Sequence, residues 1–311
     1  MAAFRMGLLG AGRMGRTHLR ALAGSDVLRI VAVADPLESA RAAVAAEGIA
    51  VHAELAAMLR TGGLDGVLIA SSSDTHLGCI AELAAAGLPI LCEKPCGLSS
   101  REGKEAAHIA SGANVPLQVA YWRRFVPSLK TLQTRIVAGE LGSLYLAACY
   151  QWDEQPPPAS FRSRSGGIFM DMAVHEFDQI RWLSGQEIGA LHAVAAGTIS
   201  DPPVAGDAES AQVLCALSGG ATGMVSLGRR FPLGDVCKVE IFGTRGAQEC
   251  RFLWPPAAER VFLEALRLQA ESFVRWVGGG PAEGATALDA VAALEAAERA
   301  SRIFENGGER R

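Results

Sequence analysis

The stretch Met6-Gly7-Leu8-Leu9-Gly10-Ala11-Gly12-Arg13-Met14-Gly15 decides the N-terminal fold, because a short apolar run leads directly into Gly-x-Gly-x-x-Gly and then into a helical pattern. Gly10 allows a tight turn, Gly12 lets the backbone approach a pyrophosphate, and Gly15 permits close packing of helix on strand. The first N–H groups of the helix then face the phosphates. The stretch predicts a dinucleotide-binding turn whose cofactor contacts are Gly10, Gly12, Arg13, Met14 and Gly15.

An acidic residue follows the second predicted strand. Leu28 to Ala34 is apolar and ends in Asp35, about 20 residues beyond the last glycine. A carboxylate there binds both ribose hydroxyls and repels a 2′-phosphate, so we expect NAD as cofactor in preference to NADP. Three glycines can also fall together by chance in an Ala/Gly-rich chain. The strand, the helix and the acid in their expected places argue against that alternative.

Composition bounds the kind of protein and its partners. A chain of 311 residues, half of them hydrophobic, is long enough for two domains. The net charge of -4 is small and the basic residues are scattered, so a small-molecule ligand is favoured over nucleic acid or a membrane surface. No apolar run reaches the ~20 residues that span a bilayer, and no signal peptide is indicated, so we expect a cytoplasmic protein. The cysteines include no Cys-x-x-Cys pair, which favours reduced core residues over disulfides or zinc.

The first 120 residues alternate short apolar runs with helical patterns, which is typical of a doubly wound parallel sheet. We therefore predict an α/β protein with an N-terminal Rossmann domain over residues 1–120. Its expected strands lie near residues 5–9, 28–34, 66–71, 89–92 and 116–120.

The rhythm changes over residues 121–311, for which we predict an α+β substrate-binding and oligomerisation domain with a largely antiparallel, open sheet. Helices are expected after Pro127 and near 168–184, 259–277 and 286–305. The expected strands are 188–199, 209–218, 222–231, 237–243 and 247–252. An open sheet with one uncovered face often binds a second subunit, so we expect a homodimer or homotetramer.

Glu93-Lys94-Pro95 lies at the carboxyl end of a predicted Rossmann strand, where ligands bind in this architecture. An ammonium group there can hydrogen-bond a substrate hydroxyl and stabilise the alkoxide that develops as hydride leaves. We assign Lys94 to catalysis and substrate binding, and Glu93 to the cofactor site. The alternative is a solvated surface lysine beside a turn.

Asp171, His175 and Asp178 fall at i, i+4 and i+7 in a predicted helix, within Ser165-Gly166-Gly167-Ile168-Phe169-Met170-Asp171-Met172-Ala173-Val174-His175-Glu176-Phe177-Asp178. This spacing places the three side chains on one face. A histidine between carboxylates can act as a general base. A buried, hydrogen-bonded histidine is the alternative, and a metal site is disfavoured because no second histidine lies nearby.

Two further segments carry weaker signals. Ser71-Ser72-Ser73-Asp74-Thr75-His76 follows a strand and is expected to cap a helix through Asp74, with Ser71 and His76 near the cofactor. Tyr121-Trp122-Arg123-Arg124-Phe125 begins the second domain, where Arg124 is a candidate substrate ligand and a surface arginine is the alternative.

These motifs occur in this order in the Gfo/Idh/MocA oxidoreductases, which the chain resembles over nearly its whole length and most closely in their inositol 2-dehydrogenases. The resemblance rests on the glycine fingerprint, Asp35, Glu93-Lys94-Pro95, Arg123-Arg124-Phe125-x-Pro127, a Pro-Pro-Pro segment at 156–158 and Gly166-Gly167-x-x-x-Asp171-x-x-x-His175-x-x-Asp178. It implies a two-domain fold, dependence on NAD(P), frequent dimers or tetramers, and a catalytic set of Lys94, Asp171 and His175.

The chain departs from the inositol dehydrogenase pattern at one substrate-facing loop. Leu227-Gly228-Arg229 stands where those enzymes commonly have Asn-Ser-Arg, and Pro232-Leu233-Gly234-Asp235-Val236 replaces Tyr-Gly-Tyr-Asp-Gln. We therefore expect oxidation of a secondary hydroxyl on a cyclic polyol or sugar, or the reverse reduction, without a fixed identity for the polyol. A non-catalytic NAD-binding regulator and an imine or enone reductase of the same family are the alternatives.

Overall fold

The computed structural model describes residues 2–196 and 207–306, and these form two compact units. The first unit runs to Phe125 and resumes over Leu263–Val291, while the second covers Val126–Phe262 and continues from Ala292. The sequence-based division assigned everything after residue 120 to the second domain. The structure differs from this division, because Leu263–Val291 returns to the first unit. The last three residues of the strand expected at 188–199 lie outside the described part.

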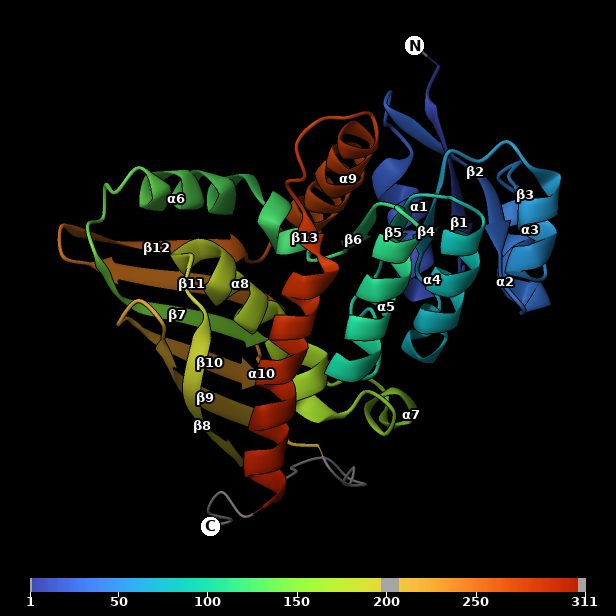
Figure 1. Ribbon diagram of the computed structural model, residues 1–311. Helices are drawn as coiled ribbons and strands as arrows, with labels where there is room; N and C mark the ends of the chain where they lie inside the picture. The colour runs from blue at the N-terminus through green and yellow to red at the C-terminus, as the bar shows by residue number, and fades with distance from the viewer. Residues whose placement is uncertain (1, 197–206, 307–311) are drawn as a thin grey trace. The chain divides into compact units, whose positions relative to one another are not determined.

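A mostly parallel sheet forms the first unit (Figure 1). Within the described residues its seven strands lie in the order β13-β6-β5-β4-β1-β2-β3, and only β13 is antiparallel to its neighbour. The strands are β1 (Phe4–Leu9), β2 (Leu28–Ala34), β3 (Ala50–His52), β4 (Gly66–Ile69), β5 (Ile90–Cys92), β6 (Leu117–Val119) and β13 (Ala285–Thr286). The predicted Rossmann sheet is confirmed, and its two edge strands, β3 and β13, were not predicted from the sequence.

Helices connect these strands. They are α1 (Arg13–Leu22), α2 (Glu38–Ala45), α3 (Leu55–Thr61), α4 (His76–Ala85) and α5 (Ser100–Gly112), with short turns η1 (Ser73–Thr75) and η2 (Trp122–Phe125). The later part of α9 (Ala258–Val277) belongs to the same unit, because Ala270 and Phe273 are buried in one hydrophobic cluster with Met6 and Leu68. Burial of this apolar face is the physical reason why a segment so late in the chain joins the Rossmann unit.

The second unit is built on a six-stranded sheet in the order β12-β11-β7-β10-β9-β8 among the described residues. Its strands are β7 (Leu144–Trp152), β8 (Ile188–Ala196), β9 (Ser210–Leu217), β10 (Thr222–Gly228), β11 (Val236–Gly243) and β12 (Gly246–Leu253). Every pairing is antiparallel except that of β10 with β7, which confirms a largely antiparallel sheet. Strand β7 was not predicted from the sequence, although it is a central strand.

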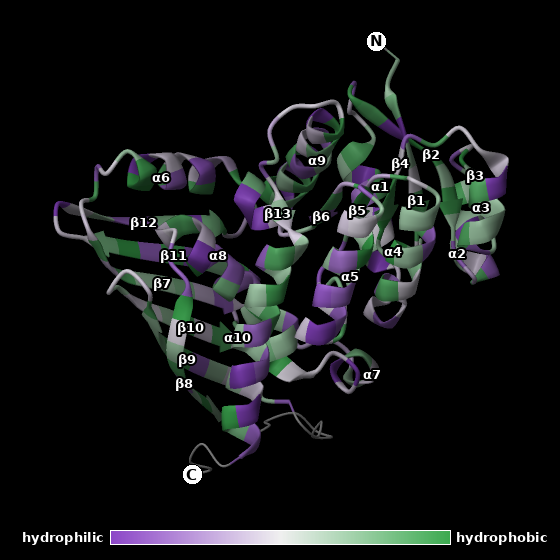
Figure 2. Cartoon of the chain, in the orientation of Figure 1, coloured by the Kyte–Doolittle hydropathy of each residue, from purple (hydrophilic) through white to green (hydrophobic). Residues whose placement is uncertain are grey.

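One face of this sheet is covered and the other is open. Side-chain burial alternates along β9 and β11, and hydropathy alternates along the strands in Figure 2. Helices α6 (Pro127–Val137) and α8 (Val174–Ser184) pack on the covered side. The unit also contains α7 (Ala159–Arg162), η3 (Phe169–Ala173) and the later part of α10 (Ala287–Glu305).

Candidate functional site

Parallel register gathers the predicted cofactor residues at one edge of the first sheet. Leu9 pairs with Ala34 and Ile69, and Ile69 pairs with Cys92, so β1, β2, β4 and β5 end in one row. The residues that follow these strand ends are Gly10, Asp35, Ala70, Ser71, Glu93 and Lys94. The carboxyl edge of such a sheet is where ligands bind in doubly wound folds.

The glycine turn has the backbone that a dinucleotide requires. Gly10 has φ +95°, and a Cβ there would lie 2.6 Å from the carbonyl oxygen of Ala70. A Cβ on Gly15 would lie 2.0 Å from the carbonyl oxygen of Gly10, so neither position accepts a side chain. A Cβ on Gly12 would instead meet open space, and the N-terminus of α1 has no side-chain cap. These features leave the helix N–H groups accessible to a pyrophosphate and fit the implied cofactor.

Asp35 is part of the same turn. Its Oδ2 accepts a hydrogen bond from the Ala11 N–H at 2.7 Å and its Oδ1 accepts from the Leu37 N–H at 2.8 Å. Asp35 therefore contacts the glycine turn, and its binding of the adenosine ribose stays a prediction. Arg13 and Met14 form the first residues of α1, with Arg13 exposed.

His76 and Ser71 support this edge of the sheet. The fully buried His76 ring lies between two carbonyl oxygens, with Nδ1 2.7 Å from that of Pro95 and Nε2 3.1 Å from that of Ser71. The Ser71 and Thr75 hydroxyl oxygens are 2.7 Å apart. The expectation that Asp74 caps a helix is wrong, because α4 begins at His76 without a side-chain cap and Asp74 lies inside η1.

The Glu93 side chain connects the turn that contains Lys94 to α1, and this contact was not predicted from the sequence. Its Oε1 lies 2.7 Å from Nε2 of the fully buried His18, and its Oε2 accepts from the Lys94 N–H at 3.2 Å. Lys94 itself is half-buried, and the Lys94–Pro95 peptide bond is cis. His18 lies one turn beyond the glycine fingerprint, on the buried side of α1. Its sequence context is that of any other helical histidine, so only the structure reveals that it is buried.

Arg123 and Arg124 are buried in η2, which rules out the alternative of a surface arginine. The Arg123 guanidinium lies over the Trp122 ring, 5.8 Å from its centroid. Arg124 pairs with Asp289 at 3.4 Å. Both arginines therefore have structural partners within the first unit, and Arg124 stays a predicted substrate ligand.

In the second unit, Asp171 lies within a helical irregularity and His175 follows it. Asp171 is in the π-helical turn η3, while His175 and Asp178 are in α8, which ends at Ser184 and is followed by Gly185 in the left-handed conformation. The sequence predicts one uninterrupted α-helix, whereas in the structure the spacing i, i+4, i+7 crosses a change of helical pitch. Single π turns of this kind are frequent at functional sites. His175 and Asp178 are buried, and the Asp171 side chain is 13% exposed.

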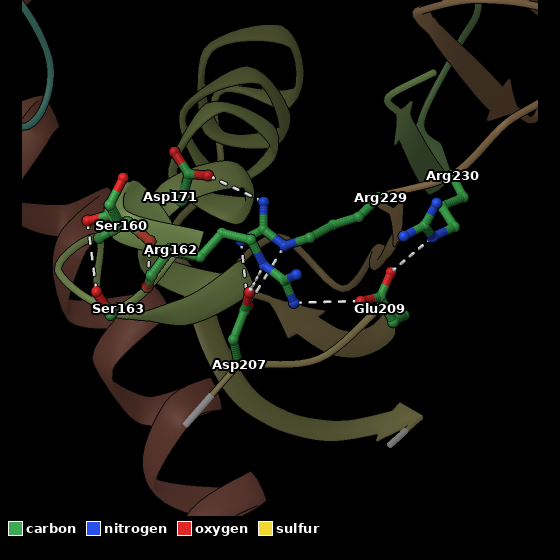
Figure 3. Close-up of polar contacts among 9 residues, drawn as sticks. Ser160, Arg162, Ser163, Asp171, Asp207, Glu209, Arg229 and Arg230 are labelled. Carbon is green, nitrogen blue, oxygen red and sulfur yellow. Dashed lines mark hydrogen bonds and ion pairs between the residues drawn. The ribbon is translucent and has the colours of Figure 1, made fainter. Parts of the chain in front are cut away.

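A chain of ion pairs ends at the Asp171 carboxylate (Figure 3). Arg229 Nη1 donates to Asp171 Oδ2 at 3.1 Å, and Arg229 Nη2 donates to Asp207 Oδ1 at 3.1 Å. Arg162 Nε donates to the other oxygen of Asp207 at 2.6 Å. These partners come from four separate stretches of sequence, so no local pattern could have revealed them.

Asp153 is another carboxyl group near Asp171, and its pKa is raised. Burial, together with the negative charges of Asp235 and Asp171, raises the pKa of Asp153 to about 6 against the lowering effects of Gln151 and Arg229. Its N–H donates to the carbonyl oxygen of Gly228 at 2.9 Å. A carboxyl group with this pKa changes its charge close to neutral pH, which is a property of many site residues.

The departure at Leu227-Gly228-Arg229 has a packing explanation. A Cβ on Gly228 would lie 2.0 Å from the Trp152 ring, so the tryptophan occupies the space of any side chain at residue 228. Leu227 and Arg229 are fully buried. No side chain therefore fits at residue 228 beside the indole ring of Trp152, whose Nε1 donates to the Ser226 hydroxyl at 3.2 Å.

Comparison with known proteins identifies both parts of the chain. Residues 4–121 match the oxidoreductase family with an NAD-binding Rossmann fold, and residues 129–249 match the Gfo/Idh/MocA C-terminal domain. In the part that the structure describes, no helix has both the length and the apolarity needed to cross a membrane.

Relatives align over nearly the full length. The rhizopine catabolism protein MocA of Rhizobium meliloti is 53% identical over 98% of this chain and 96% of its own, and a scyllo-inositol 2-dehydrogenase (NAD(+)) of Bacillus subtilis (strain 168) is 33% identical over 97% and 94%. The crystal structure of a myo-inositol dehydrogenase from Corynebacterium glutamicum superposes with a TM-score of 0.89 at 26% identity, covering 98% and 97% of the two chains. The chain therefore belongs to the Gfo/Idh/MocA family and is an NAD-dependent oxidoreductase.

Proposed function

We propose that this oxidoreductase acts on a secondary hydroxyl of a cyclic polyol or sugar, which it oxidises with NAD, or that it catalyses the reverse ketone reduction. The observation that carries the proposal is the presence of Lys94 at the carboxyl edge of the first sheet, of Asp171 in the π turn and of His175 in the first turn of α8. A cofactor-binding regulator needs the glycine turn but none of these three groups. Relatives with inositol dehydrogenase names align over nearly the whole chain, which supports the same class of substrate.

Each of the three residues has a role that its chemistry permits. His175 takes the proton of the reacting hydroxyl, and Asp171 orients its imidazole and balances the imidazolium charge. The Lys94 ammonium hydrogen-bonds the same oxygen and stabilises its developing negative charge. When bound, NAD supplies the carbon that accepts the hydride. The proposed substrate-binding residues are Lys94, Arg124, Asp171, His175 and Asp178.

For the cofactor, we propose that the turn from Gly10 to Gly15 binds the pyrophosphate and that Asp35 binds the adenosine ribose. The carboxylate of Asp35 disfavours a 2′-phosphate by charge repulsion, so NAD is preferred over NADP. Ser71, His76 and Glu93 complete the proposed cofactor site, with His76 and Glu93 shaping its backbone through their hydrogen bonds.

A cofactor-reduction screen tests the proposed substrate class. The purified protein is assayed with inositol isomers, aldoses and sugar acids in NAD and in NADP, and rhizopine is included because of the name of the 53% identical relative. We expect turnover of one or a few ring isomers and none of 2-butanol, since a pocket that reads several hydroxyls rejects analogues that lack them. Turnover of 2-butanol contradicts the polyol pocket, and no turnover of any compound favours the regulator.

Two variants separate the proposed chemistry from an imine or enone reductase of the same family. His175→Ala and Lys94→Met are each expected to lower kcat for alcohol oxidation by about 10² to 10⁴ while NAD binding stays near that of the wild type. A His175→Ala enzyme with normal alcohol oxidation would instead favour reduction of a C=N or C=C bond, which needs no histidine base.

We also propose that a second copy of the chain covers the open face of the second sheet, giving a homodimer or homotetramer. Val194 and Leu214 are 56% and 59% exposed on neighbouring strands at this face. Because His192 pairs with Leu214 and Val194 pairs with Gln212, both apolar side chains point to the same side of the sheet. Exposed apolar groups on a flat sheet are typical of subunit interfaces.

A further inference from the structure

Arg229 is the largest fully buried side chain in the described part of the protein, and it binds two carboxylates at once. It follows the last residue of β10, and its N–H donates to the carbonyl oxygen of Glu209 at 2.8 Å. Its Nη1 donates to Asp171 Oδ2, while Nε and Nη2 both donate to Asp207 Oδ1, at 3.3 and 3.1 Å. The guanidinium therefore bridges Asp171 to Asp207.

The Asp207 carboxylate in this bridge also accepts a hydrogen bond from a second arginine. Arg162 Nε donates to Asp207 Oδ2 at 2.6 Å, and Arg162 Nη2 donates to Glu209 Oε1 at 3.2 Å, as Figure 3 shows. The side chains of Arg162, Asp207 and Arg229 are 3%, 0% and 0% exposed. Asp171, at 13%, is more exposed than these three and lies at the end of the chain of contacts.

Burying so many charges is an expensive way to stabilise a fold. Desolvation of each ion offsets much of the attraction within the pairs, and an apolar cluster of similar volume is often as stable. What charge-assisted hydrogen bonds add is a defined orientation, because a planar guanidinium fixes the carboxylates on its edges. In this chain, the hydrogen bonds of Arg229 orient the carboxylate of Asp171, which lies in the π-helical turn η3.

We propose that Arg229 is a positioning residue that holds the Asp171 carboxylate in one rotamer, and that Asp207 holds Arg229. The proposal rests on the proposed function, in which Asp171 orients the His175 base. Arg229 acts only through Asp171, so it influences the rate of the chemical step and leaves cofactor binding unchanged. A lysine at residue 229 keeps the charge but loses the planar, two-edged geometry.

The kinetic test uses Arg229→Lys and Asp207→Asn, with Arg181→Lys as a matched control. Arg181 forms a two-point ion pair with Glu187 in the same unit, at 2.7 and 2.8 Å, away from Asp171. We expect kcat for the ring polyol to fall about 10- to 100-fold in both test variants, with Kd for NAD unchanged, and the control to match the wild type. Asp207→Asn keeps the result interpretable if Arg229→Lys does not fold.

A double-mutant cycle shows whether Arg229 acts through Asp171. In an Asp171→Asn background, we expect Arg229→Lys to change kcat by less than about twofold, because the group that it positions has lost its charge. Multiplicative losses of kcat in the double variant overturn the proposal.

Crystal structures of the wild type, Arg229→Lys and Asp207→Asn give a readout that needs no turnover. We expect the Asp171 side chain to leave its wild-type rotamer, or to occupy more than one, in the variants. An unchanged Asp171 rotamer in both variants overturns the positioning role. If the wild type oxidises no ring polyol, the proposed function fails, and the crystal structures still decide whether Arg229 positions Asp171.

Discussion

At the scale of single residues, Asp35 is expected to set the choice of cofactor. Asp35→Ser removes the charge that repels a 2′-phosphate, so the ratio of kcat/KM with NAD to that with NADP should fall by about 10- to 100-fold, or roughly 1–3 kcal/mol. Asp65→Ser is the control, because Asp65 also accepts a backbone N–H, that of Arg5 at 2.7 Å, next to the start of β4. Equal use of NADP by the wild type contradicts this role of Asp35.

Asp153 is expected to make stability depend on pH. Its pKa of about 6 lies above the value of 3.8 for an unperturbed aspartate, so the folded state binds this proton more tightly than the unfolded state does. The contribution of Asp153 to stability therefore falls by an amount on the order of 1–3 kcal/mol as the pH rises from about 4 to about 6. Above that range it stays low.

Asp153→Asn removes this titration. The variant should gain in Tm relative to the wild type at pH 7.5, and the gain should shrink at pH 4.5. Thermal melts at the two pH values check this, with the exposed Asp26→Asn as control. A gain that is equal at both pH values would show that the charge of Asp153 is not responsible.

At the scale of elements, the His18–Glu93 pair joins α1 to the turn after β5. Removing one partner leaves a buried polar group unsatisfied, so His18→Leu should lower the free energy of unfolding by roughly 2–4 kcal/mol and also lower kcat, because Glu93 holds the Lys94 N–H. His18→Gln, with an amide N–H in place of the ring nitrogen, should retain most of the free energy of unfolding and most of kcat.

The double variant His18→Leu/Glu93→Leu separates the two effects. With both polar partners gone, chemical denaturation should show most of the lost stability restored, since two apolar side chains of suitable size can replace a buried polar pair. The value of kcat should stay low because Lys94 has lost its support. Recovery of kcat together with stability would mean that the pair serves folding alone.

At the scale of the whole molecule, the open face of the second sheet is expected to set the oligomeric state. Leu214→Asp and Val194→Asp place a charge on that face, and burying an unpaired charge between subunits is costly. Analytical ultracentrifugation should show a smaller species for each variant than for the wild type. Val137→Asp, at a residue that is 74% exposed at the end of α6, is the control. A wild type that sediments as a monomer contradicts the proposal.

How far the fold can be predicted depends on how local its signals are. The alternation of apolar runs and helices placed β1, β2, β4, β5 and β6 near their observed bounds. The signal for β7 was missed because Ala147, Ala148 and Cys149 give its centre little β propensity, and only pairing with β10 and β11 makes it a strand. The two residues of β13 become a strand only through pairing with β6.

The sequence by itself determined the class of the fold, the family and the candidate residues, because glycine turns, strand-end acids and helical spacings are written over short stretches. Only the tertiary structure decided what each candidate contacts: His18 against Glu93, and Arg229 between Asp171 and Asp207. The physical reason is that burial and ion pairing depend on segments far apart in the chain. Arg229 is 58 residues from Asp171, and no periodicity joins them.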